Sequence, residues 1–282
     1  MAFIAAAMLL QVNVTDAICG GAWTREQGKF YLKTSIFTLR SNLYATLNGE
    51  EIESADFQLF GALLYGEYGL TNALTATVNF PVLKSLGFNT TETKTGIGDL
   101  AIDFKYQLVS GDFPVAIGLG IELPTGDEKG FGFVNGSDQK SYLVLPTGDG
   151  ETNLWVRAFA SHSFYPVAAY LSVDAGYNFR TQNFDSKFTD QFEFGAEGGY
   201  KIAGTVWIKA ALRSLAPART PNATAGASFL YGEGVQSLSA IFGAAIEVAP
   251  HFNLSAEVSQ PFGSLKNLYR GTTFAVGLAF EN

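Results

Sequence analysis

Histidine and serine side chains are the first candidates for chemistry, because some membrane hydrolases use a Ser–His pair. The chain has only two histidines, His162 in the stretch ASHSF and His251 after Pro250. Neither stands where a serine and an acid would meet it at matching height on neighbouring strands. The sequence also lacks a phosphate-binding glycine loop, a cysteine cluster and an HExxH motif. We therefore expect no enzyme activity, no cofactor and no metal site, with a lipid hydrolase as the less favoured alternative.

The acids of a repeated motif are the second candidates. LPTGD occurs at residues 123–127 and again at 145–149. Proline ends a strand because it has no N–H to donate, and Thr-Gly-Asp supplies turn chemistry. We interpret the two copies as paired turns at the two ends of a long loop. The alternative is that Asp127 and Asp149 form a cation or substrate site at the mouth of the fold.

Alternation of apolar and polar residues predicts the elements that must position such groups. In VAAYLSVDAGYNFR, residues 167–180, one face carries Val, Leu, Tyr and Phe, and the other carries Ser, Asp, Asn and Arg. Most of these segments reach 10 to 16 residues, whereas soluble strands peak at about 5–6 and a tilted membrane-spanning strand needs about 9–11. Twelve segments share the pattern, at 28–40, 55–70, 72–84, 97–109, 113–124, 151–164, 167–180, 187–202, 204–215, 234–248, 252–262 and 267–280.

Long and short connections alternate between these segments. This alternation is typical of an up-and-down barrel, and the cost of an unpaired strand edge in lipid requires the sheet to close. The sequence predicts an all-β, closed antiparallel up-and-down transmembrane β-barrel of about 12 strands, with both chain ends at the tight-turn end. Tight turns are expected near 70–72, 111–112, 165–166, 203–204 and 250–251, and longer loops at 41–54, 85–96, 125–150, 181–186, 216–233 and 263–266.

Charged residues fall on the faces that such a barrel turns toward its lumen. Eight acids against seven bases predict weak ion selectivity. We interpret them as a network of paired charges, and a polar ladder that guides a solute is the alternative. Glu67 lies in a segment of ambiguous register. The expected lumen-lining residues are Lys33, Asp99, Asp103, Lys105, Glu122, Arg157, Asp174, Arg180, Glu193, Glu197, Lys201, Lys209, Arg213, Glu247 and Glu257.

Glycines and loop aromatics would shape the same lumen. Glycines on the inward faces either leave space there or relieve packing at bends. The loop at 125–150 is long enough to be a functional element. It could fold inward as a constriction loop and present Phe131, Phe133 and Tyr142 to an apolar solute, or it could lie over the rim.

Composition excludes other classes of protein. The net charge is −8 with a pI near 4.8, and no basic patch for nucleic acid is present. A single cysteine, Cys19, cannot form a disulfide within one chain. No run of about 18 apolar residues predicts a transmembrane helix. Residues 1–22 resemble a secretory signal peptide, and cleavage after Ala22 would leave 23–282 as the barrel domain.

The stretch GIGDLAIDFKYQLVSGDFPVAIGLGIELPTGD, residues 96–127, resembles the outer-membrane family of phenol-degradation meta-pathway proteins. AWTREQGKFYLK, GEYGLTNALTATVNFPV and the second LPTGD segment fit the same family pattern. The last strand, TTFAVGLAFEN, resembles the C-terminal assembly signal of outer-membrane proteins. The resemblance implies a passive channel, in the outer membrane of a Gram-negative bacterium, for small hydrophobic or aromatic compounds. It implies outer-membrane lipid, a small solute and the barrel-assembly machinery as partners. A structural or adhesive barrel without transport, and a soluble β-sandwich, are the alternatives.

Overall fold

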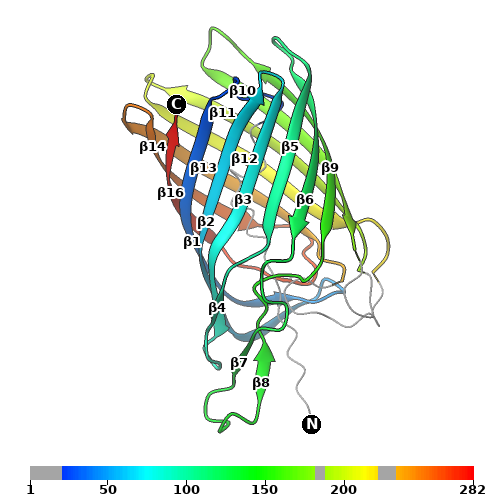
Figure 1. The fold of residues 1–282 in the computed structure, drawn as a ribbon. Helices are drawn as coiled ribbons and strands as arrows, with labels where there is room; N and C mark the ends of the chain where they lie inside the picture. The colour runs from blue at the N-terminus through cyan, green and yellow to red at the C-terminus, as the bar shows by residue number, and fades with distance from the viewer. Residues whose placement is uncertain (1–20, 182–187, 222–232) are drawn as a thin grey trace.

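The computed structural model describes residues 21–181, 188–221 and 233–282. Most of the expected signal peptide, and parts of the expected loops at 181–186 and 216–233, lie outside these ranges. Long antiparallel strands form a barrel (Figure 1). The barrel strands are β1 (Phe30–Ala45), β2 (Glu51–Thr71), β3 (Leu74–Phe88), β5 (Leu100–Val109), β6 (Val115–Leu123), β9 (Asn153–Ser163), β10 (Ala169–Arg180), β11 (Gln191–Ile202), β12 (Val206–Pro217), β13 (Ser237–Ala249), β14 (Phe252–Pro261) and β16 (Thr273–Glu281).

Pairing between the first and last strands closes the wall. β1 pairs with β16 from Tyr31↔Glu281 to Leu39↔Thr273, and its other edge pairs with β2. Every neighbouring pair of barrel strands is antiparallel. No barrel strand in the described ranges therefore presents a free edge, which confirms the predicted closed barrel of twelve strands.

Short turns gather at one end of the barrel, the upper end in Figure 1. Between β11 and β12, the N–H of Thr205 bonds the carbonyl of Ile202, and Ala203 and Gly204 both take positive φ, at 50° and 71°. Positive φ at both central residues is the geometry of a type I′ turn, whose twist matches the twist of the two paired strands. Asn282 lies at the same end, where its side-chain Oδ1 accepts a hydrogen bond from the Phe30 N–H at 2.7 Å.

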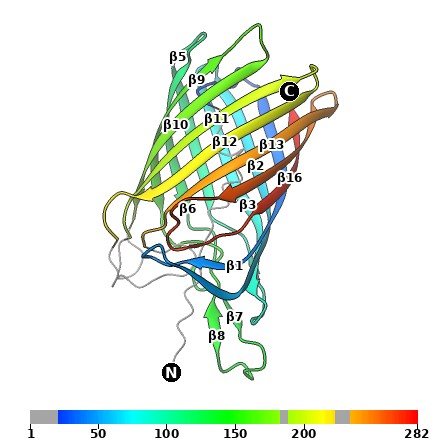
Figure 2. The ribbon, with the colours of Figure 1, turned by 180° about the vertical axis from the view of Figure 1, so that it is seen from behind.

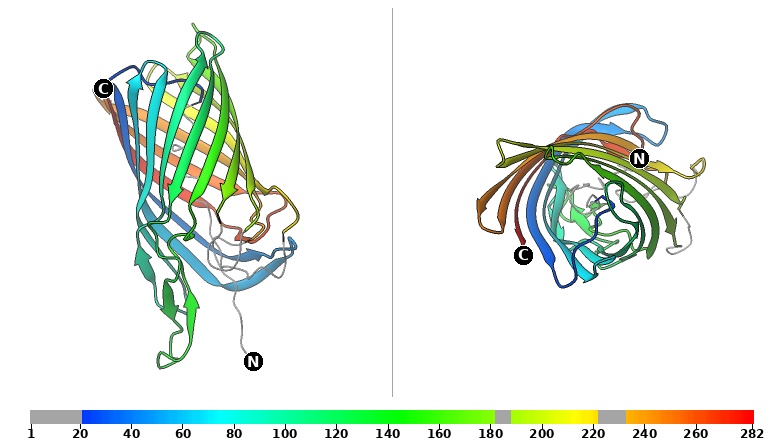
Figure 3. Two further views of the ribbon diagram at one scale, coloured as in Figure 1. Left: turned by 45° about the vertical axis from the view of Figure 1, so that its right-hand side comes forward. Right: turned by 90° about the horizontal axis from the view of Figure 1, so that it is seen from above.

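The opposite end is elaborated. β1 and β2 continue as a hairpin that bends across this end (Figures 2 and 3). The expected loop at 41–54 is therefore partly strand, because ladder pairing persists as far as Ala45↔Glu51. Part of the expected loop at 85–96 is also paired, as Ser85↔Thr95 shows, whereas, among the described residues, 263–266 contains only a single bridge from Lys266 to Gln236. The short strands here are β4 (Lys94–Gly96), β7 (Phe131–Phe133), β8 (Tyr142–Val144) and β15 (Leu268–Tyr269).

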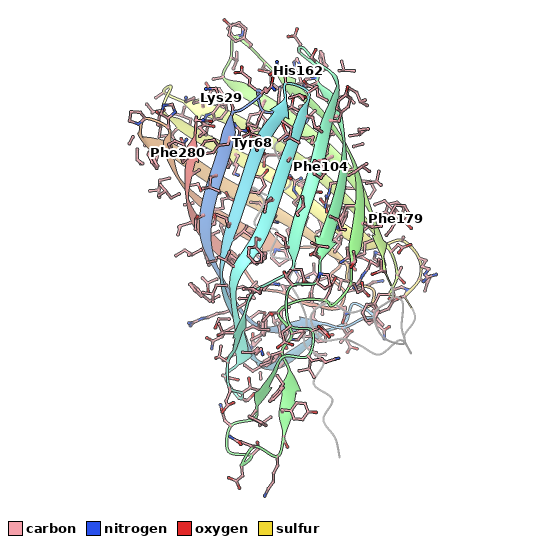
Figure 4. The ribbon with its side chains drawn as sticks, viewed as in Figure 1. Lys29, Tyr68, Phe104, His162, Phe179 and Phe280 are labelled. Carbon is pink, nitrogen blue, oxygen red and sulfur yellow. The ribbon has the colours of Figure 1, made fainter. Side chains whose placement is uncertain are left out.

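The two faces of the wall differ in polarity. Outward side chains are apolar and exposed, as at Ile36 (48%) and Phe274 (58%), while the inward Lys33 is buried (3%). Aromatic side chains such as Phe104 and Phe179 lie along the outer wall (Figure 4), as expected for a surface that meets lipid. None of the described residues forms a helix long and apolar enough to cross a membrane.

Candidate functional site in the barrel lumen

Ion pairs in the middle part of the lumen connect strands that are separated by one intervening strand. Arg157 on β9 bonds Asp103 on β5, and its Nη2 lies 4.0 Å from Glu193 Oε2 on β11. The same guanidinium lies over the Trp155 ring at 4.3 Å. Arg213 on β12 reaches Asp174 across β11, with Nη1–Oδ1 at 3.3 Å. Cations and anions are therefore placed beside each other around the wall.

A second group lies nearer the tight-turn end. Lys33 on β1 and Lys209 on β12 both place Nζ 3.2 Å from Glu257 Oε1. Tyr170 donates its hydroxyl to Glu197 at 2.5 Å. Because these side chains are largely buried against the wall, each pair is stronger than an exposed pair would be, and the loss of either partner is penalised.

Inward glycines provide the space in which these side chains lie flat on the wall. A Cβ at Gly277 would lie 2.5 Å from Lys33 Cε, and one at Gly243 would lie 2.9 Å from Lys209 Cε. A Cβ at Gly195 would clash with the Arg213 guanidinium. Each of these glycines therefore leaves the space that a long charged side chain from the neighbouring strand occupies.

Apolar side chains line the half of the lumen nearer the elaborated end. Phe37 and Leu39 follow Lys33 on the inward face of β1, and both are buried. Leu215 follows Arg213 on β12, and with Phe37, Leu39 and Trp155 it belongs to one buried cluster. The sequence reading missed this segment because it assigned apolar faces to lipid. The signal was present in ADFQLFGALLYG, residues 55–66, which is apolar on both faces.

An aromatic group continues this cluster to the end of the barrel. Phe57 stacks on Tyr269 with ring centroids 4.9 Å apart, and Tyr44 and Phe88 contact the same ring at 5.4 and 6.0 Å. Tyr44 also donates its hydroxyl to Asn267 Oδ1 at 3.0 Å. The lumen thus changes from charged to apolar along its axis.

The chain preceding β1 lies inside the tight-turn mouth, as the darkest blue segment in Figure 3 shows. Ala22 N–H donates to Ser161 Oγ at 2.8 Å, and Lys105 Nζ donates to the Gly21 carbonyl at 3.0 Å. Arg25 Nε bonds Glu67 Oε2 at 2.6 Å, which places Glu67 on the inward face. Burial opposes the charge of Arg25, yet the adjacent Glu67 outweighs it and raises the pKa of the guanidinium.

Some expected lining residues lie at the rims instead. Glu122 and Arg180 stand at strand ends on the elaborated side, where Arg180 Nε bonds Glu151 Oε2 at 2.7 Å. Lys201 lies near the tight turns, 5.9 Å from the Trp207 ring. Glu247 is exposed at the same end, beside a register shift in β13.

The two LPTGD copies meet each other and share one carboxylate. Asp99 Oδ1 accepts the N–H of Gly126 at 2.9 Å, and its Oδ2 accepts the N–H of Asp149 at 2.8 Å. Gly126 and Gly148 pack so closely that a Cβ on Gly126 would lie 2.5 Å from Gly148 Cα. Asp99, from the earlier GIGD stretch, therefore clamps both turns.

The motif acids are engaged by protein donors. Asp127 Oδ2 bonds Lys94 Nζ at 2.6 Å, and Asp149 Oδ2 accepts from Asn153 Nδ2 at 2.6 Å. No group of three potential metal ligands occurs in the described part of the chain. The hydrogen bond from Lys94 lowers the pKa of Asp127. Burial, then the nearby Asp149, raises the pKa of Asp99 to about 6.

Both histidines lie in aromatic surroundings at the tight-turn end. His162 stacks on Phe113 with centroids 4.1 Å apart, and its Nδ1 is 2.8 Å from the Asp112 carbonyl. His251 lies 6.0 Å from the Phe280 ring. Within the described residues, neither imidazole forms a hydrogen bond with a serine hydroxyl or an ion pair with a carboxylate.

The loop aromatics lie on a small hairpin. Phe131 contacts Phe133 and Tyr142 with centroids 5.2 and 5.3 Å apart. β7 and β8 project beyond the barrel end (Figure 1), and Tyr142 is 59% exposed. The hairpin bonds the segment before β4, through Glu92 N–H to the Phe133 carbonyl at 2.8 Å. This pairing places the three side chains outside the span of the wall.

Comparison with known proteins supports the fold. No protein-family model matches the chain, and no curated protein matches its sequence. An outer membrane channel from Pseudomonas putida F1 is similar, with a TM-score of 0.72 and 12% identity over 93% of this chain and 98% of that chain. The translocator domain of autotransporter NalP from Neisseria meningitidis has a TM-score of 0.52, with 10% identity over 95% of this chain and 91% of that one.

A further similar structure is a deletion mutant of TodX, described as a monoaromatic hydrocarbon channel. Its TM-score is 0.50, with 9% identity over 93% of this chain and 91% of that chain. Identities this low show a shared architecture. The protein therefore shares the closed β-barrel fold of these outer-membrane proteins.

Proposed function

We propose that this protein is a passive channel in the outer membrane of a Gram-negative bacterium, and that it admits small hydrophobic or aromatic compounds. The observation that supports the proposal is the lumen itself. A buried apolar segment around Phe37, Leu39 and Leu215 continues into a segment of paired charges. An apolar solute gains from burial in the first segment, and the self-neutralised second segment presents no large net charge to repel it.

The proposed activity requires no catalysis and no cofactor. A solute would move down its own concentration gradient, and its rate would depend on lumen width and lining. The outward apolar wall would be solvated by outer-membrane lipid, and assembly would depend on the barrel-assembly machinery. TodX, a monoaromatic hydrocarbon channel with a similar barrel, is a precedent for an aromatic solute. The assignment of the solute rests on the lumen lining, because a shared fold does not establish a shared function.

The test is reconstitution of the purified full chain. In planar bilayers we expect discrete ohmic current steps, and in liposomes we expect accelerated swelling with small polar solutes that do not cross lipid unaided. A toluene-type solute should reduce the current by occupying the apolar segment. A folded, heat-modifiable barrel that passes neither ions nor small solutes would contradict the channel and would favour a structural barrel.

A further inference from the structure

Arg213 has an unused edge. Its Nη1 bonds Asp174 Oδ1 at 3.3 Å and the Leu212 carbonyl at 3.1 Å. Among the described residues, neither Nε nor Nη2 has a hydrogen-bond partner, although the side chain is only 2% exposed. Nε and Nη2 form the side-on fork that matches the two oxygens of a carboxylate.

A buried guanidinium edge without an acceptor is costly. Unmade hydrogen bonds of a buried charged group cost more than those of a neutral one. By contrast, Arg157 uses its guanidinium more fully, because it bonds Asp103 and stacks on Trp155. Arg213 is therefore the lumen cation best able to accept a carboxylate from outside the protein.

Arg213 also stands at the boundary between the charged and the apolar parts of the lumen. The next inward residue on β12, Leu215, is 2% exposed and belongs to the apolar cluster. Trp155, in the same cluster, lies one inward position from Arg157 on β9. A ligand with its charge on Arg213 would thus have apolar wall beside its body.

We propose that the Nε and Nη2 edge of Arg213 is a binding subsite for the carboxylate of a small apolar or aromatic acid, whose body lies in the apolar segment near Leu215 and Trp155. This inference deepens the proposed channel function and rests on it for the route by which the ligand enters. The guanidinium lies over Gly195 of the strand between β10 and β12, and a side chain at that position would clash with it.

Neighbouring acids sharpen the selectivity of this subsite. Asp174 and Glu193 face it from β10 and β11, whereas Arg157 is the second cation nearby. A simple anion gains little against those carboxylates. An acid with an apolar body adds about 25 cal/mol for each Å² of apolar surface that it buries. Benzoate should therefore bind, and acetate and chloride should not.

The test uses the full chain at pH 8 with benzoate as the probe, and benzyl alcohol and acetate as matched controls. Binding is measured in micelles by tryptophan fluorescence, and block of ionic current is measured in planar bilayers. Arg213→Gln should weaken benzoate binding by about 10- to 100-fold, the loss expected for charge-assisted hydrogen bonds. Lys209→Gln removes another lumen cation, one that Glu257 already holds, and it should retain binding.

A double variant serves as a control for the possibility that Arg213→Gln alone fails to fold. Arg213→Gln combined with Asp174→Asn removes the pair without stranding a buried carboxylate, and it should show the same loss. Equal benzoate affinity in wild type and both Arg213 variants would overturn the subsite, as would equal loss in Lys209→Gln. Benzoate binding that depends on Arg213 in a protein that passes no current would support the subsite and contradict the channel. Ionic current in a protein whose benzoate binding does not depend on Arg213 would support the channel and contradict the subsite.

Discussion

Gly195→Ala tests whether inward glycines seat the charges of the lumen. The position lies on β11 between Asp174 of β10 and Arg213 of β12 in the strand register. An added methyl group would overlap both the Arg213 guanidinium and the Asp174 carboxylate. One of these side chains must move, and the Nη1–Oδ1 contact of 3.3 Å between them must lengthen.

The expected magnitude follows from two opposing effects. Overpacking in a dense interior costs about 1–3 kcal/mol, and replacing glycine where alanine fits without strain gains about 0.4–1 kcal/mol. We expect Gly195→Ala to lower the free energy of unfolding by about 1–2 kcal/mol. Gly198→Ala is the matched control on the same strand, because a Cβ there meets its nearest neighbour, the Tyr170 carbonyl, at 3.5 Å.

The assay is reversible urea unfolding of the barrel in lipid vesicles, followed by tryptophan fluorescence. The Gly195→Ala variant should unfold at lower urea concentration than wild type, and Gly198→Ala should equal or exceed wild type. In a background with Arg213→Gln, the shorter side chain should remove part of the cost, and the two changes should be non-additive. Equal stability of the two alanine variants, or full additivity with Arg213→Gln, would refute the claim that Gly195 makes room for the Arg213 guanidinium.

The remaining predictions concern the rim. Asp99→Ala should destabilise the barrel by about 2–5 kcal/mol, since it leaves the Gly126 and Asp149 N–H groups without their acceptor. Asp127 forms a half-exposed ion pair with Lys94, so Asp127→Ala should cost under about 1 kcal/mol in the same urea unfolding assay. Similar losses of stability in the two variants would argue that Asp99 does not hold the two turns together. Burial raises the pKa of Asp99 from 3.8 to about 6 and that of Glu151 from 4.5 to about 7. The folded state therefore binds protons more tightly than the unfolded chain, and the free energy of unfolding should rise as pH falls from about 7 toward 4. Asp99→Asn should weaken this pH dependence, and a dependence unchanged in that variant would contradict the assignment.

Strand alternation was sufficient to predict the closed barrel and the inward direction of its charges. Asp174 and Arg213 stand on faces that the period of two alone identifies, and closure follows from the cost of a free edge in lipid. Which charges pair was not predictable. Arg213 reaches Asp174 across a glycine of the strand between them, so the pairing depends on register that a single sequence does not give.

Other features of the lumen depend on contacts distant in sequence. The segment before β1 has no alternation, and its partners Glu67 and Lys105 lie on β2 and β5. Asp99 clamps two turns that are 27 and 50 residues away. Phe37 and Leu39 were assigned to no lumen role because apolar residues suit a lipid-facing wall equally well. The alternation of residues along one strand cannot distinguish an apolar face that lines the lumen from one that faces lipid, since that depends on how the assembled wall is oriented.

The central claim is that the inward face lines a water-filled path through the membrane. The most direct measurement compares cysteines at adjacent positions of β14 in a background with Cys19→Ser, using a charged thiosulfonate during planar-bilayer recording. Ser255 is half-buried on the inward face, and Ala256 is exposed on the outer wall. Modification of the Ser255→Cys variant should reduce the single-channel current, and the Ala256→Cys variant should be unaffected. Current loss at Ala256→Cys, or none at Ser255→Cys, would contradict the account.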